Sequence, residues 1–220
     1  MIINLLEGAL NFIFPPVCGI CGKTDDKYIC SKCFDRLKIY EKVKTDTYED
    51  KYFKTHFWIY EYKDEIRKRI IDYKFNDKSY IFRTFVELIE SNSKAVEYIN
   101  SFDVIVPVPI HKKRLKQRGY NQCELIAKAL SKSMVNLTYA NKILIKKRNI
   151  TPQSTLNKAE RASNIQGAYQ LLDAQRYDLK SKRILIFDDI YTTGSTVNEC
   201  AKVLRKLTNE KIGVFTLAKD

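Results

Sequence analysis

The stretch Ile184-Leu185-Ile186-Phe187-Asp188-Asp189-Ile190-Tyr191-Thr192-Thr193-Gly194-Ser195-Thr196 decides the fold of this chain. Four apolar residues without a polar break predict a strand buried on both faces, as in the parallel sheet of an α/β protein. We expect the two acids to end that strand and the small hydroxyl residues to form a loop. The apolar residues after the loop recur at helical spacing, namely Val197, Cys200, Ala201, Leu204 and Leu207. The loop is therefore expected at a helix N-terminus.

This order of elements indicates a site for a ribose 5-phosphate. Free N–H groups and the positive end of the helix dipole suit a phosphate monoester, and the hydroxyl groups of the loop add donors. Gly194 lets the backbone approach the ligand. The ionised carboxylates of Asp188 and Asp189 accept hydrogen bonds from a vicinal diol. The alternative is a tight strand-to-helix turn with merely solvated acids.

Length and charge limit the possible functions. The chain has 220 residues, 45% of them hydrophobic, which is enough for one substantial core and a small accessory module. The net charge of +13 favours polyanionic partners such as nucleotides or nucleic acid without choosing among them. Residues 1–14 lack a basic start and a small-residue cleavage site, and they predict a short packed helix. We expect a cytoplasmic protein with no membrane span.

Four cysteines near the N-terminus form two Cys-x2-Cys pairs, Cys18 with Cys21 and Cys30 with Cys33. Two such knuckles place four thiolates around one tetrahedral ion, so the pattern predicts a closed structural Zn2+ site. A redox pair or an iron site is the alternative. The short spacer predicts a small module that packs against its neighbours. Cys123 and Cys200 fall on apolar helix faces and are expected in the core.

The remaining chain alternates strands and helices. We expect a connector over 34–54, a strand at 57–62, helices near 66–73 and 80–99, and strands at 103–109, 142–147 and 212–218. The charged face of the first helix, which includes Lys74, is expected to be solvated, and a contact with a polyanion is the alternative. Strand–helix alternation from residue 103 onward predicts an open parallel sheet with right-handed crossovers and helices on both faces. The expected division is a helix and zinc module in 1–45, a connector and hood-like region in 46–100, and the main domain in 101–220.

Two further segments carry positive charge. A basic loop over 111–122 follows the proline-broken strand 103–109, a position where α/β proteins seat an anionic group. Pyrophosphate fits Lys112, Lys113 and Arg118, although a solvated basic loop is the alternative. The long polar segment from Arg148 to Arg161 is typical of a lid.

The residues 184–196 resemble the phosphoribosyl pyrophosphate (PRPP) signature of type I phosphoribosyltransferases, which has four hydrophobics, two acids and a Thr-Thr-Gly-x-Thr loop. Together with three other features in the same order, this signature resembles the ComF family. Those features are the cysteine knuckles, Val-Pro-Val-Pro-Ile at 106–110 followed by Arg-Gly-Tyr-Asn-Gln at 118–122, and the 148–161 segment followed by Gly-Ala-Tyr at 167–169.

The resemblance implies a zinc module joined to a type I phosphoribosyltransferase-like domain. It implies PRPP bound with Mg2+, with Asp188 and Asp189 as catalytic and ribose-binding residues. The 5-phosphate would lie on Thr192, Thr193, Gly194, Ser195 and Thr196, and the pyrophosphate under Lys112, Lys113, Arg118, Arg148 and Arg161.

The resemblance also implies a role in natural transformation at the cytoplasmic side of DNA uptake, with single-stranded DNA, a competence helicase and other uptake proteins as further partners. Three hypotheses stay open. The first is a PRPP-binding phosphoribosyltransferase-like competence protein, with or without transfer to an unidentified acceptor. The second is a single-stranded DNA-binding adaptor, and the third is a PRPP-sensing regulator without transferase activity.

Overall fold

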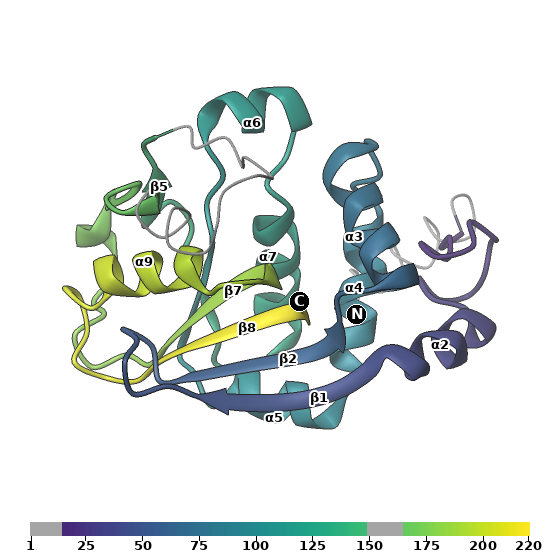
Figure 1. The fold of residues 1–220 in the computed structure, drawn as a ribbon, viewed down its shortest axis with the longest axis horizontal. Coiled ribbons are helices and arrows are strands. Elements are labelled where there is room, and N and C mark those ends of the chain that lie inside the picture. Colours follow the sequence, from purple (N-terminus) through teal and green to yellow (C-terminus); the bar gives the residue numbers. More distant parts are fainter. Residues whose placement is uncertain (1–14, 149–164) are drawn as a thin grey trace, which may run out of the picture.

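The computed structural model describes residues 15–148 and 165–220. Six strands form one open sheet in the order β1-β2-β8-β7-β3-β4 (Figure 1). The pairs from β2 to β4 are all parallel, and β1 is antiparallel to β2. The strands of this sheet are β1 Glu41–Thr47, β2 Thr55–Glu61, β3 Val104–Pro107, β4 Thr138–Tyr139, β7 Ile184–Tyr191 and β8 Ile212–Lys219.

The two central strands explain the continuous apolar runs in the sequence. Residues 184–187 of β7 and 214–215 of β8 have no exposed surface, because helices cover both faces of the sheet at this position. The helices are α2 Ser31–Leu37, α3 Asp64–Phe75, α4 Ile81–Glu90, α5 Ser93–Asn100, α6 Lys112–Arg118, α7 Gln122–Ser133 and α9 Ser195–Leu204. Short 3-10 turns occur at Lys38–Tyr40 and Ala174–Arg176.

The handedness of the crossovers decides which helix covers which face. The connection from β3 through α7 to β4 moves along the sheet in one direction, and the connection from β7 through α9 to β8 moves in the other. Right-handed crossovers in opposite directions place their helices on opposite faces, so α7 and α9 lie on the two sides of β7 (Figure 1). The prediction of an open, mostly parallel α/β sheet with helices on both faces is confirmed.

Several predicted boundaries are wrong in detail. Residues 41–47, expected in a connector, form β1, because pairing with the edge of β2 orders this polar segment. The helix expected over 80–99 is two helices, since the side chain of Asn92 accepts the N–H of Ala95 and starts α5. The expected basic loop contains α6, which begins where His111 caps it and ends at Gly119 with φ 81°.

The strand expected at 142–147 lies outside the main sheet. It is β5 Leu144–Lys146, which pairs antiparallel with β6 Tyr169–Leu171 in a separate two-stranded sheet. The division at residues 45 and 100 stays a prediction, although the main sheet draws β1 and β2 from before residue 101. In the described ranges, no helix has the length and apolar character needed to cross a membrane. The predicted N-terminal helix of 1–14 lies outside the described residues.

Candidate functional site

The site lies where the carboxyl ends of β3 and β7 meet. These strands are paired neighbours from Val104–Ile184 to Pro107–Phe187. The chain leaves β3 toward β4 and leaves β7 toward β8, so the two connections diverge at this point. Open α/β sheets bind ligands at such a switch point. The segments after β3 and after β7, both singled out in the sequence, are therefore brought to one edge of the sheet.

The acid pair lies inside β7 rather than at its end. β7 continues through Ile190 and Tyr191, because its backbone keeps pairing with β8 as far as Tyr191 and Lys219. The expectation that the acids terminate the strand is therefore wrong. Asp188 and Asp189 are 8% and 3% exposed, so neither is a solvated turn residue. The alternative of merely solvated acids does not describe this site.

The loop after β7 is short and shaped by one glycine. Gly194 has φ 75° and precedes α9, and a Cβ atom there would collide with the ring of Tyr191. Thr193 Oγ1 lies 2.9 Å from Ser195 Oγ and accepts the N–H of Ser195 at 3.3 Å. The N-cap residue Gly194 has no side chain to cap α9, and among the backbone N–H groups of the described residues Thr193 Oγ1 accepts only that of Ser195. The first turn of α9 thus presents its dipole and N–H groups toward the loop.

Asp188 is held by a thiol. Burial, and then the neighbouring charge of Asp189, raises the pKa of Asp188 to about 7. Burial also raises the pKa of Cys123, so its thiol stays protonated and donates to Asp188 Oδ1 at 3.3 Å. The sulfur of Cys123 and one carboxylate oxygen each of Asp188 and Asp189 all lie within 4.8 Å of one another. Cys123 is a core residue, as predicted, but it also contacts the acid pair.

Asp189 is paired with a lysine from α3. Lys74 Nζ lies 2.8 Å from Asp189 Oδ2, and the two side chains are 18% and 4% exposed. Burial lowers the pKa of Lys74, but the charges of Asp189 and Asp188 outweigh this and raise it overall. The expectation that Lys74 belongs to a solvated face is wrong. Its spacing after Ile66 and Ile70 places it on the buried face of α3, and this signal could have identified it.

The predicted pyrophosphate residues are distributed around α6. Lys112 and Lys113 are exposed at the start of α6, and the backbone N–H of Lys113 donates to His111 Nδ1. Arg118 is the last residue of α6. It donates a hydrogen bond to Gln122, and its guanidinium carbon lies 5.1 Å from the ring centre of Phe75. Arg148 donates to the carbonyl of Gln166 and is also exposed. Arg161 and the rest of the predicted lid from residue 149 lie outside the described residues.

The four N-terminal cysteines come together. Their sulfur atoms lie within 4.8 Å of one another. Thiolates at about 2.3 Å from a tetrahedral Zn2+ are about 3.8 Å apart, and Cys21 Sγ and Cys30 Sγ are 3.8 Å apart. Burial alone would raise the pKa of Cys18, but backbone N–H groups of the knuckles outweigh it and bring the pKa to about 7. The donor set fits Zn2+, and the zinc prediction is confirmed.

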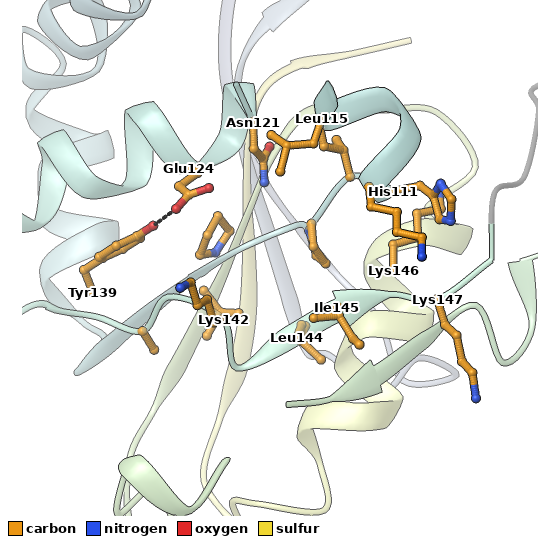
Figure 2. Close-up of a pocket in the computed structure, with 16 residues that line it drawn as sticks. His111, Leu115, Asn121, Glu124, Tyr139, Lys142, Leu144, Ile145, Lys146 and Lys147 are labelled. Atoms are coloured by element: carbon orange, nitrogen blue, oxygen red, sulfur yellow. Dashed lines mark hydrogen bonds between the residues drawn. The ribbon is translucent and has the colours of Figure 1, made fainter. Parts of the chain in front are cut away.

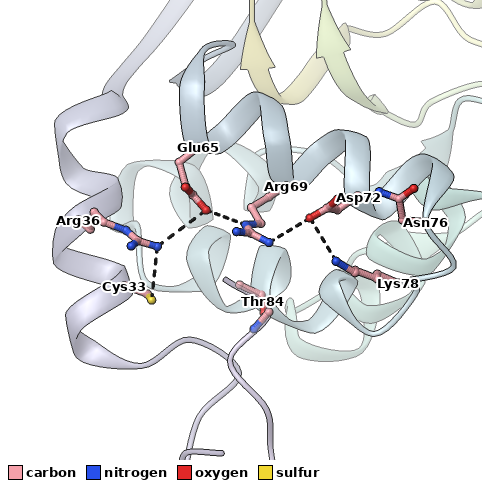
Figure 3. A network of polar contacts seen from close by, with 9 residues as sticks. Cys33, Arg36, Glu65, Arg69, Asp72, Asn76, Lys78 and Thr84 are labelled. Carbon is pink, nitrogen blue, oxygen red and sulfur yellow. Dashed lines mark hydrogen bonds and ion pairs between the residues drawn. The ribbon is translucent and has the colours of Figure 1, made fainter. Parts of the chain in front are cut away.

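The zinc module packs on α3 and α4, as its short spacer predicted. The N–H of Gly19 donates to Thr84 Oγ1 at 3.1 Å, and the N–H of Tyr28 donates to Glu87 at 2.7 Å. Figure 3 shows a line of charged contacts that starts at the metal ligand Cys33 and runs along α3. The contacts are Arg36 to Cys33 and to Glu65, both at 3.8 Å, and Arg69 to Glu65 at 2.7 Å and to Asp72 at 3.0 Å. The contacts of the zinc module thus reach α3, the helix that carries Lys74.

The fold and the site define a class: a four-cysteine zinc module joined to an open, mostly parallel α/β domain with a buried acid pair at its switch point. Comparison with known proteins agrees with this class. Residues 9–43 match the family model described as a double zinc ribbon domain. The chain is 29% identical over 209 residues to competence protein F of Haemophilus influenzae, covering 93% of this chain and 85% of that protein.

Two further relatives extend the similarity. Competence protein ComFC of Bacillus subtilis is 26% identical, with 93% of this chain and 78% of that protein covered. DNA utilization protein YhgH of Escherichia coli is 23% identical, with 93% and 83% covered. The resemblance of this chain to the ComF family is therefore confirmed over most of its length. The solved structure of Leishmania donovani UMP synthase aligns with a TM-score of 0.32 and 18% identity over 86% of this chain and 31% of that one, a likeness that carries no conclusion here.

Proposed function

We propose that this chain binds PRPP at the switch point between β3 and β7 and acts as a phosphoribosyltransferase-like protein in DNA uptake. The observation that carries the proposal is the buried pair Asp188 and Asp189, which β7 places directly before the loop at the N-terminus of α9. A phosphate site and a diol site at this spacing match the two ends of a ribose 5-phosphate.

The residues take distinct parts in this proposal. Loop residues 192–196 bind the 5-phosphate through N–H groups and hydroxyls. Asp188 and Asp189 accept hydrogen bonds from the ribose hydroxyls. Lysines and arginines of α6 and of the 148–161 segment neutralise the pyrophosphate, and Mg2+ enters with PRPP on that group.

A transfer step follows from the same placement. An acceptor nitrogen forms a bond to C1 of the ribose, and the bond from C1 to the pyrophosphate oxygen breaks. The electron pair of that bond leaves with pyrophosphate. The carboxylates of Asp188 and Asp189 lie on the ribose side, where they stabilise positive charge that develops at C1. Asp188 does so only when ionised, so we expect this assistance to grow as pH rises through about 7.

The biological part of the proposal comes from the relatives. Two of them are named competence proteins and one is named a DNA utilization protein. We propose a role at the cytoplasmic side of DNA uptake, with single-stranded DNA, a competence helicase and other uptake proteins as partners, and the names of these relatives support it.

Calorimetric titration with PRPP, with and without Mg2+, tests the proposal. We expect binding by the wild type and loss of binding in the double variant Asp188→Asn with Asp189→Asn. The exposed acid pair Glu49→Ala with Asp50→Ala is the matched control and should bind like the wild type. If PRPP binds the Asn double variant as tightly as the wild type, the site is assigned wrongly.

A single-stranded DNA adaptor is a second candidate, favoured by the charge of α6. This helix of seven residues, KKRLKQR, carries five cationic side chains and no acid, and Tyr120 follows it. Contacts between these cationic side chains and DNA phosphates predict that the affinity for oligo-dT falls steeply as the salt concentration rises. Binding that does not depend on salt would eliminate the adaptor hypothesis. If PRPP alters oligo-dT affinity, oligo-dT must alter PRPP affinity equally, and this result would identify a sensor.

A further inference from the structure

A cavity of about 410 Å³ lies at the outer edge of the main sheet (Figure 2). β4 has only two residues, so it covers β3 at Val104 and Ile105 and leaves Val106 and Pro107 beside the cavity. Its walls are formed by β3 and the segment after it, β4 and the segment after it, β5, α6 and α7. Among the described residues that line it, none comes from β7 or its loop. The acid pair and its loop are therefore not part of this lining, although Lys112 is also a proposed pyrophosphate residue and Lys146 is close enough to Asp188 for their charges to interact.

The walls of the cavity are stiff and apolar. Pro107 and Pro109 have fixed φ angles and no N–H groups, so this edge of β3 offers few donors to a ligand. Leu144 and Ile145 face Leu115 across the space (Figure 2). A rigid apolar slot of this size suits a flat ring better than a flexible chain, because the ring loses little conformational freedom on binding.

One end of the cavity is cationic. Lys146 lies there beside His111, as Figure 2 shows, and its Nζ is 5.3 Å from the ring centre of Tyr169. Burial, and then the charge of Arg114, lowers the pKa of Lys146. Lys112 and Lys147 add exposed positive charge to the lining, and within residues 15–148 and 165–220 none of these three lysines forms an ion pair with a carboxylate. An anionic group of a ligand would give the Lys146 ammonium a negatively charged partner.

The opposite end carries the carboxylate of Glu124, and the exposed Lys142 lies on the same side (Figure 2). Tyr139 donates its hydroxyl to Glu124 Oε1 at 3.0 Å, and both side chains face the cavity (Figure 2). Burial and the charge of Glu124 raise the pKa of Tyr139, so the phenol stays protonated and donates to Glu124. Glu124 retains free lone pairs for an incoming N–H group.

We propose that this cavity binds a nucleotide unit whose base carries an exocyclic amino group, with the base between the prolines and Leu144, its amino group on Glu124, and its phosphate near Lys146. The volume lies within the range of about 300–1,000 Å³ common for small-ligand sites. Carboxylates accept from the amino group of cytosine, whereas thymine presents a carbonyl oxygen at the same position. A free nucleotide and a nucleotide within a single strand share this chemistry.

Calorimetry with dCMP and dTMP tests the proposal, because the two ligands have the same sugar and phosphate. We expect the wild type to bind dCMP at least about fivefold more tightly than dTMP. Glu124→Gln should abolish that preference, whereas Lys146→Met should weaken both ligands about tenfold and keep the preference. Lys128→Met, on the exposed face of α7 and outside the cavity, is the matched control and should change neither value.

Two results would overturn the proposal: no binding of dCMP to the folded wild type, or binding that Glu124→Gln and Lys146→Met leave unchanged. Nucleotide held by the 192–196 loop would be insensitive to Glu124→Gln and would be lost in Asp188→Asn with Asp189→Asn. If the cavity is the site, the variant Asp188→Asn with Asp189→Asn should still bind dCMP. The test of dCMP binding can therefore fail or succeed independently of the test of PRPP binding. A short oligo-dC strand then identifies the source: if it binds more tightly than dCMP, Lys146→Met should reduce its salt slope by about one.

Discussion

Replacing Lys74 by Met tests how the acid pair is stabilised in the folded chain. The variant removes the ammonium 2.8 Å from Asp189 and keeps most of the side-chain volume. Breaking a buried ion pair by removing one partner costs about 3–5 kcal/mol, because the other charge stays buried and unpaired. Lys74 keeps 18% of its side chain exposed, so we expect the lower end, about 3 kcal/mol of unfolding free energy.

The cost should depend on pH in a defined direction. Without Lys74, the pKa of Asp188 in the folded state rises further above its unfolded value, because the charge of Lys74 opposes the effects of burial and of Asp189. A carboxyl group with a raised folded pKa binds a proton on folding, so the penalty shrinks at low pH and is complete once pH exceeds the folded pKa. We therefore expect a larger loss of stability near pH 8 than near pH 5.

Urea unfolding at both pH values measures these effects. Lys68→Met, an exposed lysine on the same helix, is the matched control and should change stability by less than about 0.5 kcal/mol. Adding Asp189→Asn to Lys74→Met should restore most of the lost stability, because the double variant has no unpaired charge. The reasoning is refuted if Lys74→Met behaves like Lys68→Met, or if the two substitutions in the double variant are simply additive.

Three further predictions concern the loop, the acid and the metal. Gly194→Ala should cost about 3 kcal/mol of unfolding free energy, because φ 75° is strained for Ala and the new Cβ meets the Tyr191 ring. Gly22→Ala, at φ 77° with open space, should cost only about 1 kcal/mol, and equal losses would contradict the packing argument. Asp188 has a folded pKa of about 7, so ionisation costs stability as pH rises from about 4 to 7. The unfolding free energy of Asp188→Asn minus that of the wild type should therefore increase from about pH 4 to about pH 7 and stay constant at higher pH. A difference that is the same at every pH would refute the assignment. Removing Zn2+ with a chelator should lower the melting temperature and release one equivalent of metal, and Cys33→Ser should lose the metal while Cys200→Ser retains it.

The sequence predicted the central elements because their signals are local. A run of apolar residues requires burial on both faces, and a repeat of apolar residues at helical spacing requires one buried face, so β7 and α9 could be placed without knowing their partners. The zinc site followed for the same reason, since two Cys-x2-Cys knuckles contain the whole donor set within sixteen residues, Cys18 to Cys33. The open parallel sheet followed from the alternation of elements.

Three features of the fold were predicted wrongly. β1 is polar and its strand conformation comes from pairing with β2, whose sequence lies beyond a turn. Basic composition suggested a loop at 111–122, yet the N-cap at His111 and the C-cap at Gly119 stabilise α6. The acids were expected at the end of a strand because carboxylates rarely continue a buried one, and pairing with β8 extends β7 through them.

By itself, the sequence determined the zinc ligands, the acid pair, the loop after it and the class of sheet that holds them. Only the tertiary structure decided the state of the acids, because Cys123 comes from α7 and Lys74 from α3, far along the chain from Asp188 and Asp189. The cavity beside β3 also appears only in the tertiary structure, because β4 is too short to cover the whole of β3. Local pattern fixes which face of an element is buried, but the ionisation of a buried group depends on what the other elements bring to it.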